Sequence, residues 1–338
     1  MRRWWIAAAC AAVLVPQAAR AQYFGQNKVQ YRSFQFQIIQ TEHFDVYYYQ
    51  RERAAALDAA RMAERGYARL SRLLNHQWRE RKPLILYASQ SDFQQTNAVG
   101  GDIGEGTGGV TEFAKHRIIL PFTGSYADFE HVLQHEMVHA FQYDVFSRGR
   151  AGAGVQAITQ INPPLWFVEG MAEYLSLGPV DPHTAMWLRD AAIEGNLPTI
   201  EQLTFDQRIF PYRYGHAIWA YIGQKWGDEV IGAILQATMT GGIEQAFRRV
   251  LGLSLDRLSN EWRDAVQAWY LPQIAGQQKA RQFARVVLDK KQSGGTLHVA
   301  PQISPDGRRI VYLSERNFFF VDLYIADAES GRVDRRLI

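Results

Sequence analysis

Two histidines four residues apart stand near the middle of the chain, in the sequence HEMVH at residues 135–139. Residues with this spacing lie on one face of an α-helix, with Cβ atoms about 5–6 Å apart, so His135 and His139 can bind one zinc ion at about 2.0–2.1 Å each. Glu136 points slightly aside, where its carboxylate can reach a water molecule on the metal. Because HExxH arises by chance in roughly one per cent of chains this long, the motif needs support from its context.

The context supplies a buried helix and two further acids. Apolar side chains surround the two histidines, at Val132, Leu133, Met137, Val138 and Phe141. A second segment, WFVEGMAEY at residues 166–174, places Glu169 and Glu173 four apart on another predicted helix. One of these carboxylates can bind zinc while the other accepts a hydrogen bond from a histidine ligand. Two histidines and one glutamate leave a fourth position open, which is typical of a catalytic zinc site.

HEMVH followed by WFVEGMAEY resembles the gluzincin peptidases, and its second part resembles the W-x-x-E-G-x-A pattern of M1-type and peptidase-MA-like families. The resemblance implies one Zn²⁺ per chain, bound by His135, His139 and Glu169, with Glu136 as general base and Glu173 supporting a histidine ligand. The interval of 30 residues between His139 and Glu169 is longer than is usual in those families. Residues 147–164 would absorb the excess as an inserted loop, at little cost in entropy.

The same resemblance implies how a peptide is bound and how its oxyanion is stabilised. An edge strand before the HExxH helix pairs with an extended substrate, and residues 109–113 are the candidate. A downstream Tyr or His stabilises the oxyanion, and Tyr212, Tyr214 and His216 are available. Tyr214 is the favoured residue, while ordinary packing is the alternative interpretation of all three.

Helices and strands are predicted on both sides of these motifs in the sequence. Helices are predicted at residues 54–74, 126–146 and 165–175, and most of residues 181–270 is predicted to be helical. Strands are predicted within residues 34–49 and at 84–87, 110–113, 117–120, 309–313 and 319–325. The predicted fold class is therefore α+β, a zincin-like metallopeptidase domain with a mixed sheet and a mainly helical C-terminal half, followed by a β-propeller-like blade.

The end of the chain resembles one blade of a TolB-type β-propeller, through SPDG at residues 304–307 and DLYIAD at residues 322–327. One blade cannot close a propeller, so we expect either the front of a longer protein or a unit that packs on the peptidase domain. A simple β-hairpin tail is the alternative. The predicted domains are the peptidase domain at residues 22–270, a linker at 271–295 and a partial blade at 296–338, which could bind a protein partner.

The start of the chain has the layout of a secretory signal peptide over residues 1–21. Arg2 and Arg3 precede an apolar run at residues 6–15, and Ala-Arg-Ala at 19–21 is a small-x-small cleavage site. A buried N-terminal helix is the alternative. The apolar run is too short to span a hydrocarbon layer of about 30 Å, and no later segment is long and apolar enough. We therefore expect an exported bacterial envelope protein, periplasmic or secreted, with no membrane span.

Composition places the chain among globular proteins. Its 338 residues are 47% hydrophobic and 21% charged, and the net charge is +3. Cleavage would remove the single cysteine, Cys10, and with it any disulfide in the mature protein. It would also remove three of the 37 basic residues, which leaves 34 against 34 acidic residues. A net charge near zero and the lack of a basic stripe indicate no nucleic-acid partner.

These features favour an exported zinc peptidase that acts on a peptide or protein substrate by metal-activated water. A second hypothesis is an envelope interaction scaffold, whose zinc domain is structural or inactive and whose propeller binds a partner. A third is hydrolysis of a non-peptide bond at the same zinc site, because the ligands specify the activation of water and not the bond attacked.

Overall fold

The computed structural model describes residues 30–148, 159, 161–276, 280–295, 297–316 and 321–337. The predicted signal peptide and residues 149–158 of the predicted inserted loop lie outside these described residues. The chain divides into two compact units between residues 273 and 274. The first contains a mixed sheet and most of the helices, and the second a separate antiparallel sheet, so the prediction of a mixed helical and β structure is confirmed.

Five strands form the sheet of the first unit, in the order β1-β2-β3-β5-β4. They are β1 (Gln37–Gln40), β2 (Phe44–Tyr48), β3 (Lys82–Tyr87), β5 (Arg117–Pro121) and β4 (Val110–Glu112). The three central strands are parallel, and the two outer ones are antiparallel to their neighbours. Alternate residues of β2 are buried, namely Phe44, Val46 and Tyr48, so the period of two in this segment aims its apolar residues at the core.

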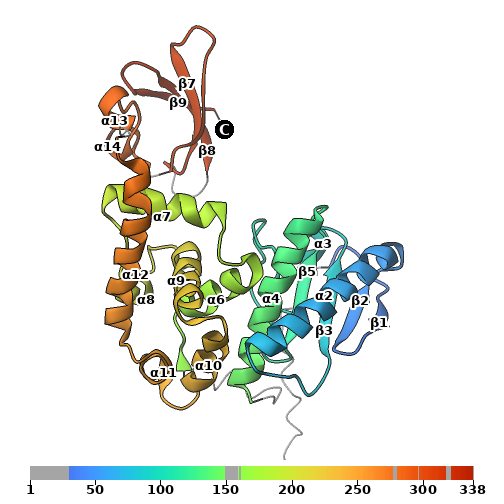
Figure 1. Cartoon of the computed structure of the whole chain (residues 1–338). Coiled ribbons are helices and arrows are strands. Elements are labelled where there is room, and N and C mark those ends of the chain that lie inside the picture. The colour runs from blue at the N-terminus through green and yellow to red at the C-terminus, as the bar shows by residue number, and fades with distance from the viewer. Residues whose placement is uncertain are drawn as a thin grey trace, which may run out of the picture. The chain divides into compact units, whose positions relative to one another are not determined.

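Two long helices, α2 (Arg53–Leu73) and α4 (Tyr126–Phe146), cover a face of this sheet (Figure 1). The Ser125 side chain caps α4 by accepting a hydrogen bond from the backbone N–H of Asp128, as N-cap residues do. Leu133, Met137 and Phe141 of α4 are fully buried. Helix α4 packs against α2, the sheet and the later helix α6, and this explains why apolar residues surround the HExxH motif on several sides.

The rest of the first unit is helical, apart from the short helices η2 (Gln50–Glu52) and α3 (Gln90–Phe93) that lie among the strands. These helices are α6 (Leu165–Leu177), α7 (Pro182–Glu194), α8 (Ile200–Phe205), α9 (Pro211–Trp226), α10 (Glu229–Thr238), α11 (Gly242–Leu251) and α12 (Leu255–Tyr270), followed by η3 (Leu271–Ile274). The largest interface is between α6 and α9. There Gly170 lies against Gly215, and a Cβ on Gly170 would stand 2.5 Å from Gly215 Cα, so only glycine allows the two backbones to approach so closely.

The second unit is a four-stranded antiparallel sheet in the order β6-β7-β8-β9. Its elements are α13 (Ala280–Phe283), α14 (Lys290–Ser293), β6 (Val299–Ile303), β7 (Arg309–Ser314), β8 (Asp322–Asp327) and β9 (Val333–Arg336). Tyr312, Tyr324 and Ala326 form its small core. The segment predicted as a linker contains the short helices η3, α13 and α14. The described part of the predicted strand at 319–325 begins at Asp322, and no closed propeller is formed by the described residues.

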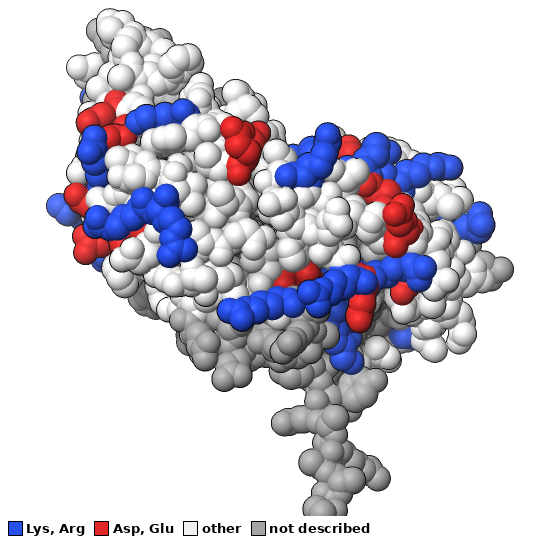
Figure 2. Space-filling view, turned by 60° about the horizontal axis from the view of Figure 1, so that its bottom comes forward, with Lys and Arg blue, Asp and Glu red and all other residues white. Residues whose placement is uncertain are grey.

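Two further features concern the charge of the described surface and the length of the described helices. Figure 2 shows a row of Lys and Arg side chains across one face of the protein, with Asp and Glu side chains beside it. Within the described ranges, no helix has the length and apolar character needed to cross a membrane.

Candidate metal centre

Helices α4 and α6 bring two histidines and one glutamate to a single point. The Nε2 atoms of His135 and His139 are 3.1 Å apart, and Glu169 Oε2 lies 3.2 Å from each of them. A tetrahedral ion with bonds of about 2.0–2.1 Å separates its ligand atoms by about 3.3 Å. The three atoms therefore have the element types and the spacing that a zinc ion requires, and one side of their triangle is left for a further ligand.

Acidic neighbours make this cluster favourable for positive charge. Burial alone would lower the pKa of His135, but the carboxylates of Glu169 and Glu173 outweigh that effect and raise the pKa to about 10. The pKa of His139 is also raised, because the attraction of Glu169 outweighs burial. Burial acts to raise the pKa of Glu169, yet the two histidines hold it well below its usual range. A metal cation bound between these side chains would supply the positive charge that protonation of the two histidines otherwise supplies.

The tautomer of His139 is set by a glutamine on the same helix. Gln142 Nε2 donates to the carbonyl oxygen of Val168 at 3.0 Å, so its Oε1 atom faces His139 Nδ1 at 2.9 Å. An amide oxygen only accepts hydrogen bonds. Nδ1 of neutral His139 must therefore carry the proton, which leaves the Nε2 lone pair free to bind a metal.

His135 is oriented by a chain of charges that begins on α6. Glu173 Oε1 lies 3.2 Å from His135 Nδ1, and Glu173 Oε2 accepts a hydrogen bond from Arg213 at 3.0 Å. Arg213 also lies 3.4 Å from Asp181. The structure thus places the Glu173 carboxylate beside His135 and pairs it with Arg213 of α9.

His131, one helical turn before His135, forms a second possible group with His135 and Glu173. This group uses the Nδ1 atom of His135, whereas the first uses Nε2. His131 Nε2 is 3.7 Å from Glu173 Oε1, and Arg213 already pairs with the other oxygen of that carboxylate. The group of His135, His139 and Glu169 is the more compact candidate.

Glu136 is held at the mouth of the cluster by the edge strand β4. The hydroxyl of Thr111 lies 2.7 Å from Glu136 Oε2 and 2.8 Å from the Glu136 carbonyl oxygen. A Cβ on Gly109 would stand 2.9 Å from Glu136 Cγ and 3.2 Å from Oε1, so the backbone before β4 passes directly over this side chain. Strand β4 is the last strand of the sheet order, so one of its edges has no partner strand among the described residues.

The structure places the three downstream candidates differently relative to the cluster. Tyr212 stacks on His135, with ring centroids 6.3 Å apart and an angle of 9° between the planes. Burial and the nearby negative charge of Glu169 raise the pKa of Tyr212 above its usual range. Tyr214, the residue favoured from the sequence, instead packs against Trp187 on another side of α9. His216 is buried, with its ring nitrogens 2.8 Å from Thr184 Oγ1 and from the carbonyl oxygen of Gly178.

An exposed aromatic surface extends outward from Tyr212. Phe210 stacks on Tyr212 at 4.9 Å, and Trp187 lies 5.7 Å from Phe210. Phe210 is 49% exposed and Trp187 is 37% exposed. We call Trp187, Phe210 and Tyr212 the aromatic ledge. Exposed apolar surface that is continuous with a polar cluster is typical of a binding site.

Three supporting residues were not predicted from the sequence, namely Thr111, Gln142 and Arg213. Gln142 stands three residues after His139, on the same helix face, and this spacing could have indicated it. Thr111 and Arg213 come from elements far along the chain, and their roles depend on how β4 and α9 pack.

Comparison with known proteins adds no assignment to this geometry. No family model matches the chain, and no curated protein matches it significantly.

Proposed function

We propose that the chain is an exported zinc peptidase of the gluzincin type, with a zincin-like first unit. The observation that carries this proposal is the triangle of His135 Nε2, His139 Nε2 and Glu169 Oε2, with sides of 3.1–3.2 Å. These three residues would hold one Zn²⁺. When bound, zinc would supply Lewis-acid chemistry, polarising the scissile carbonyl and making water more acidic near neutral pH.

Glu136 is the proposed general base. Thr111 occupies its Oε2 atom at 2.7 Å, so Oε1 is the atom available to accept a proton from the attacking water. The same oxygen then delivers that proton to the leaving amine, which restores the carboxylate. Tyr212 is the proposed donor to the developing oxyanion, because its ring stacks on His135 and the charge of Glu169 acts on its hydroxyl.

Two surfaces favour a peptide as the substrate. The backbone just before β4 passes over Glu136, and the outer edge of β4, unpaired among the described residues, offers backbone groups to an extended chain. The aromatic ledge begins at the metal ligand His135 and offers a surface for a large apolar side chain. A substrate that presents both a backbone and apolar side chains is a polypeptide.

The second unit is proposed to be a TolB-like blade that contacts a protein partner. Its antiparallel sheet and the turn between β6 and β7 support this assignment. In that turn Ser304 Oγ lies 2.5 Å from Asp306 Oδ1, and Gly307 has a φ of +69°, a conformation that favours glycine.

Replacement of Glu136 tests the peptidase proposal. Glu136→Gln keeps the size of the side chain but cannot accept the proton, so hydrolysis of unfolded casein should fall by at least about a hundredfold while zinc stays bound. Glu130→Gln, at an exposed carboxylate of the same helix, is the matched control and should keep full activity. Equal hydrolysis by Glu136→Gln and the wild type would reject the proposal.

A further inference from the structure

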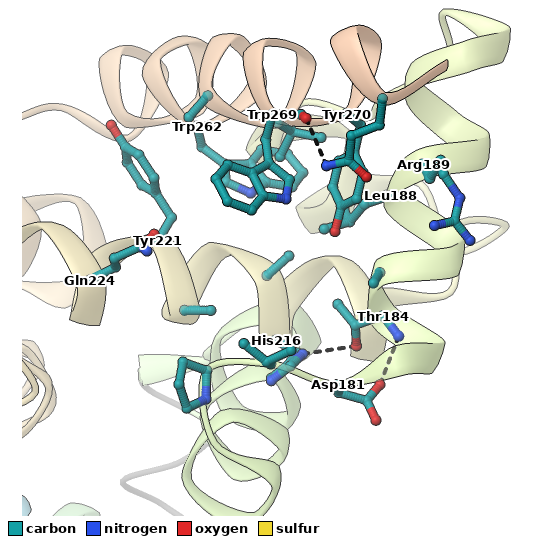
Figure 3. Close-up of a pocket in the computed structure, with 18 residues that line it drawn as sticks. Asp181, Thr184, Leu188, Arg189, His216, Tyr221, Gln224, Trp262, Trp269 and Tyr270 are labelled. Atoms are coloured by element: carbon teal, nitrogen blue, oxygen red, sulfur yellow. Dashed lines mark hydrogen bonds between the residues drawn. The ribbon is translucent and has the colours of Figure 1, made fainter. Parts of the chain in front are cut away.

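A cavity of about 640 Å³ lies in the first unit, away from the metal cluster. Figure 3 shows it between α12 and α9, with α7 along one side. Its volume falls within the range of about 300–1,000 Å³ that is usual for small-molecule sites. None of the proposed zinc ligands lines it, so the proposed peptidase chemistry does not account for it.

Aromatic and aliphatic side chains form most of the cavity wall. Trp262, Trp269 and Tyr270 come from α12, Tyr221 from α9 and Leu188 from α7 (Figure 3). Trp262 is fully buried, whereas Trp269 is 69% exposed. A tryptophan with that much exposed surface beside an apolar cavity is costly in water, because its ring has no apolar neighbour over most of its area. The wall therefore favours an occupant with a substantial apolar body.

The cavity also has a positive end. Arg189 of α7 and Tyr270 of α12 both line the cavity, with Arg189 at its outer side (Figure 3). Burial raises the pKa of Tyr270, and the charge of Arg189 acts in the opposite direction, which agrees with their proximity. No hydrogen bond or ion pair joins the Arg189 guanidinium or the Tyr270 hydroxyl to another residue in the described part of the chain. Two donors in the wall of the same cavity, one of them cationic, are thus available to an anion.

The other charged group of the wall does not oppose an anion strongly. Asp181 accepts a hydrogen bond from the backbone N–H of Thr184 at 2.7 Å and lies 3.4 Å from Arg213. Its charge is therefore largely compensated within the protein. The pKa of His216, which also lines the cavity, is lowered by burial, so this ring adds no positive charge near neutral pH. Arg189 is left as the charge that decides the polarity of the ligand.

We propose that this cavity binds an amphipathic carboxylate, with its apolar body among Trp262, Trp269 and Leu188 and its carboxylate on Arg189 and Tyr270. The site is separate from the proposed metal centre, and the proposal does not depend on peptidase activity. Binding needs no metal and no chemical step.

Calorimetric titration of the full chain with decanoate, below its micelle concentration, tests the proposal. Decanol and decyltrimethylammonium are the matched neutral and cationic probes, and both should bind at least about tenfold more weakly than decanoate. Arg189→Gln should weaken decanoate binding about tenfold and leave decanol unchanged. Arg208→Gln, at an exposed arginine that pairs with Asp206 outside the cavity, is the control and should change neither.

A second variant tests the location of the site. Ala220 lines the cavity, and Ala220→Trp should reduce decanoate affinity at least tenfold by filling the space, with thermal unfolding measured to show that the variant is folded. If Ala220→Trp does not fold, quenching of tryptophan fluorescence by a bromine-labelled decanoate replaces it as the test of location. Failure of the wild type to bind decanoate, equal affinity for the three probes, or absence of quenching would each overturn the proposal.

Discussion

The contact between Gly170 and Gly215 predicts that adding one methyl group to α6 will destabilise the protein. In Gly170→Ala the new Cβ would stand 2.5 Å from Gly215 Cα and 2.8 Å from the Gly215 carbonyl oxygen. Carbon atoms in contact are normally about 3.5–4.0 Å apart. The neighbouring atoms belong to the backbone of α9 and cannot rotate away, so the two helices must move apart by roughly 1 Å.

Two opposing effects decide the size of the change. Alanine is favoured over glycine inside a helix by about 1 kcal/mol. Overpacking of a close-packed interior typically costs about 1–3 kcal/mol and occasionally more, and a clash with rigid backbone belongs at the upper end of that range. We therefore expect Gly170→Ala to lower the free energy of unfolding by about 2 kcal/mol, measured by urea denaturation.

Gly66 on α2 provides the matched control. A Cβ there would stand 2.5 Å from Gln134 Oε1, but this atom is the end of a flexible side chain that can rotate. Gly66→Ala should therefore stay within about 1 kcal/mol of the wild type. If Gly170→Ala proved as stable as Gly66→Ala, the close approach of α6 and α9 would be wrong, and with it the placement of Tyr212 and Arg213 at the metal centre.

Three other predictions follow from contacts near α4. Asp144→Asn leaves the buried Lys82 (2.5 Å from Asp144) without its counter-ion and should cost about 3 kcal/mol in urea denaturation. Burial acts to raise the pKa of Asp144, but its pairing with His116, His76 and Lys82 lowers it. The cost of Asp144→Asn should therefore be fully present above about pH 4 and shrink as the pH falls further. A cost unchanged at pH 2 would contradict the ion pair. Tyr212→Phe should lower kcat for casein at least tenfold with zinc retained, while Tyr214→Phe should not. A larger loss of kcat in Tyr214→Phe would instead favour Tyr214 as the donor to the oxyanion. Phe210→Ala should raise KM several-fold for peptides with a large apolar side chain and not for alanine peptides; equal effects on both would argue against the aromatic ledge.

Local spacing was enough to predict part of the candidate site. His135 and His139 follow from the geometry of one helix, and the structure brings their Nε2 atoms together. Glu169 is 30 residues further along, and only the resemblance to gluzincins, not any distance in the sequence, indicated that its helix would cross α4 at this point. The packing of α6 on α4 supplies that contact.

Spacing alone could not decide which of Tyr212 and Tyr214 lies beside His135. The two residues are two positions apart, so their side chains leave α9 in nearly opposite directions. The sequence does not state which face of α9 turns toward α6. Gly215 marks that face, because it contacts Gly170, and Tyr212 stands three residues before it on the same side.

The fold was predictable where the hydrophobic period is strong and less so where it is interrupted. Helix α4 has the bounds that were predicted for it, and in the structure the Ser125 side chain caps its first turn. Within residues 181–270, the ends of α8, α10 and α11 were not predicted. These helices are short, with 6 to 10 residues, and packing rather than local sequence fixes where each one stops.

Metal content tests the central claim most directly. We expect elemental analysis of the purified protein to give about one zinc ion per chain, strongly reduced in Glu169→Ala and in His139→Ala but unchanged in Glu130→Ala, whose carboxylate is exposed on α4. Absence of zinc from the wild type, or full zinc content in Glu169→Ala, would contradict the site formed by His135, His139 and Glu169.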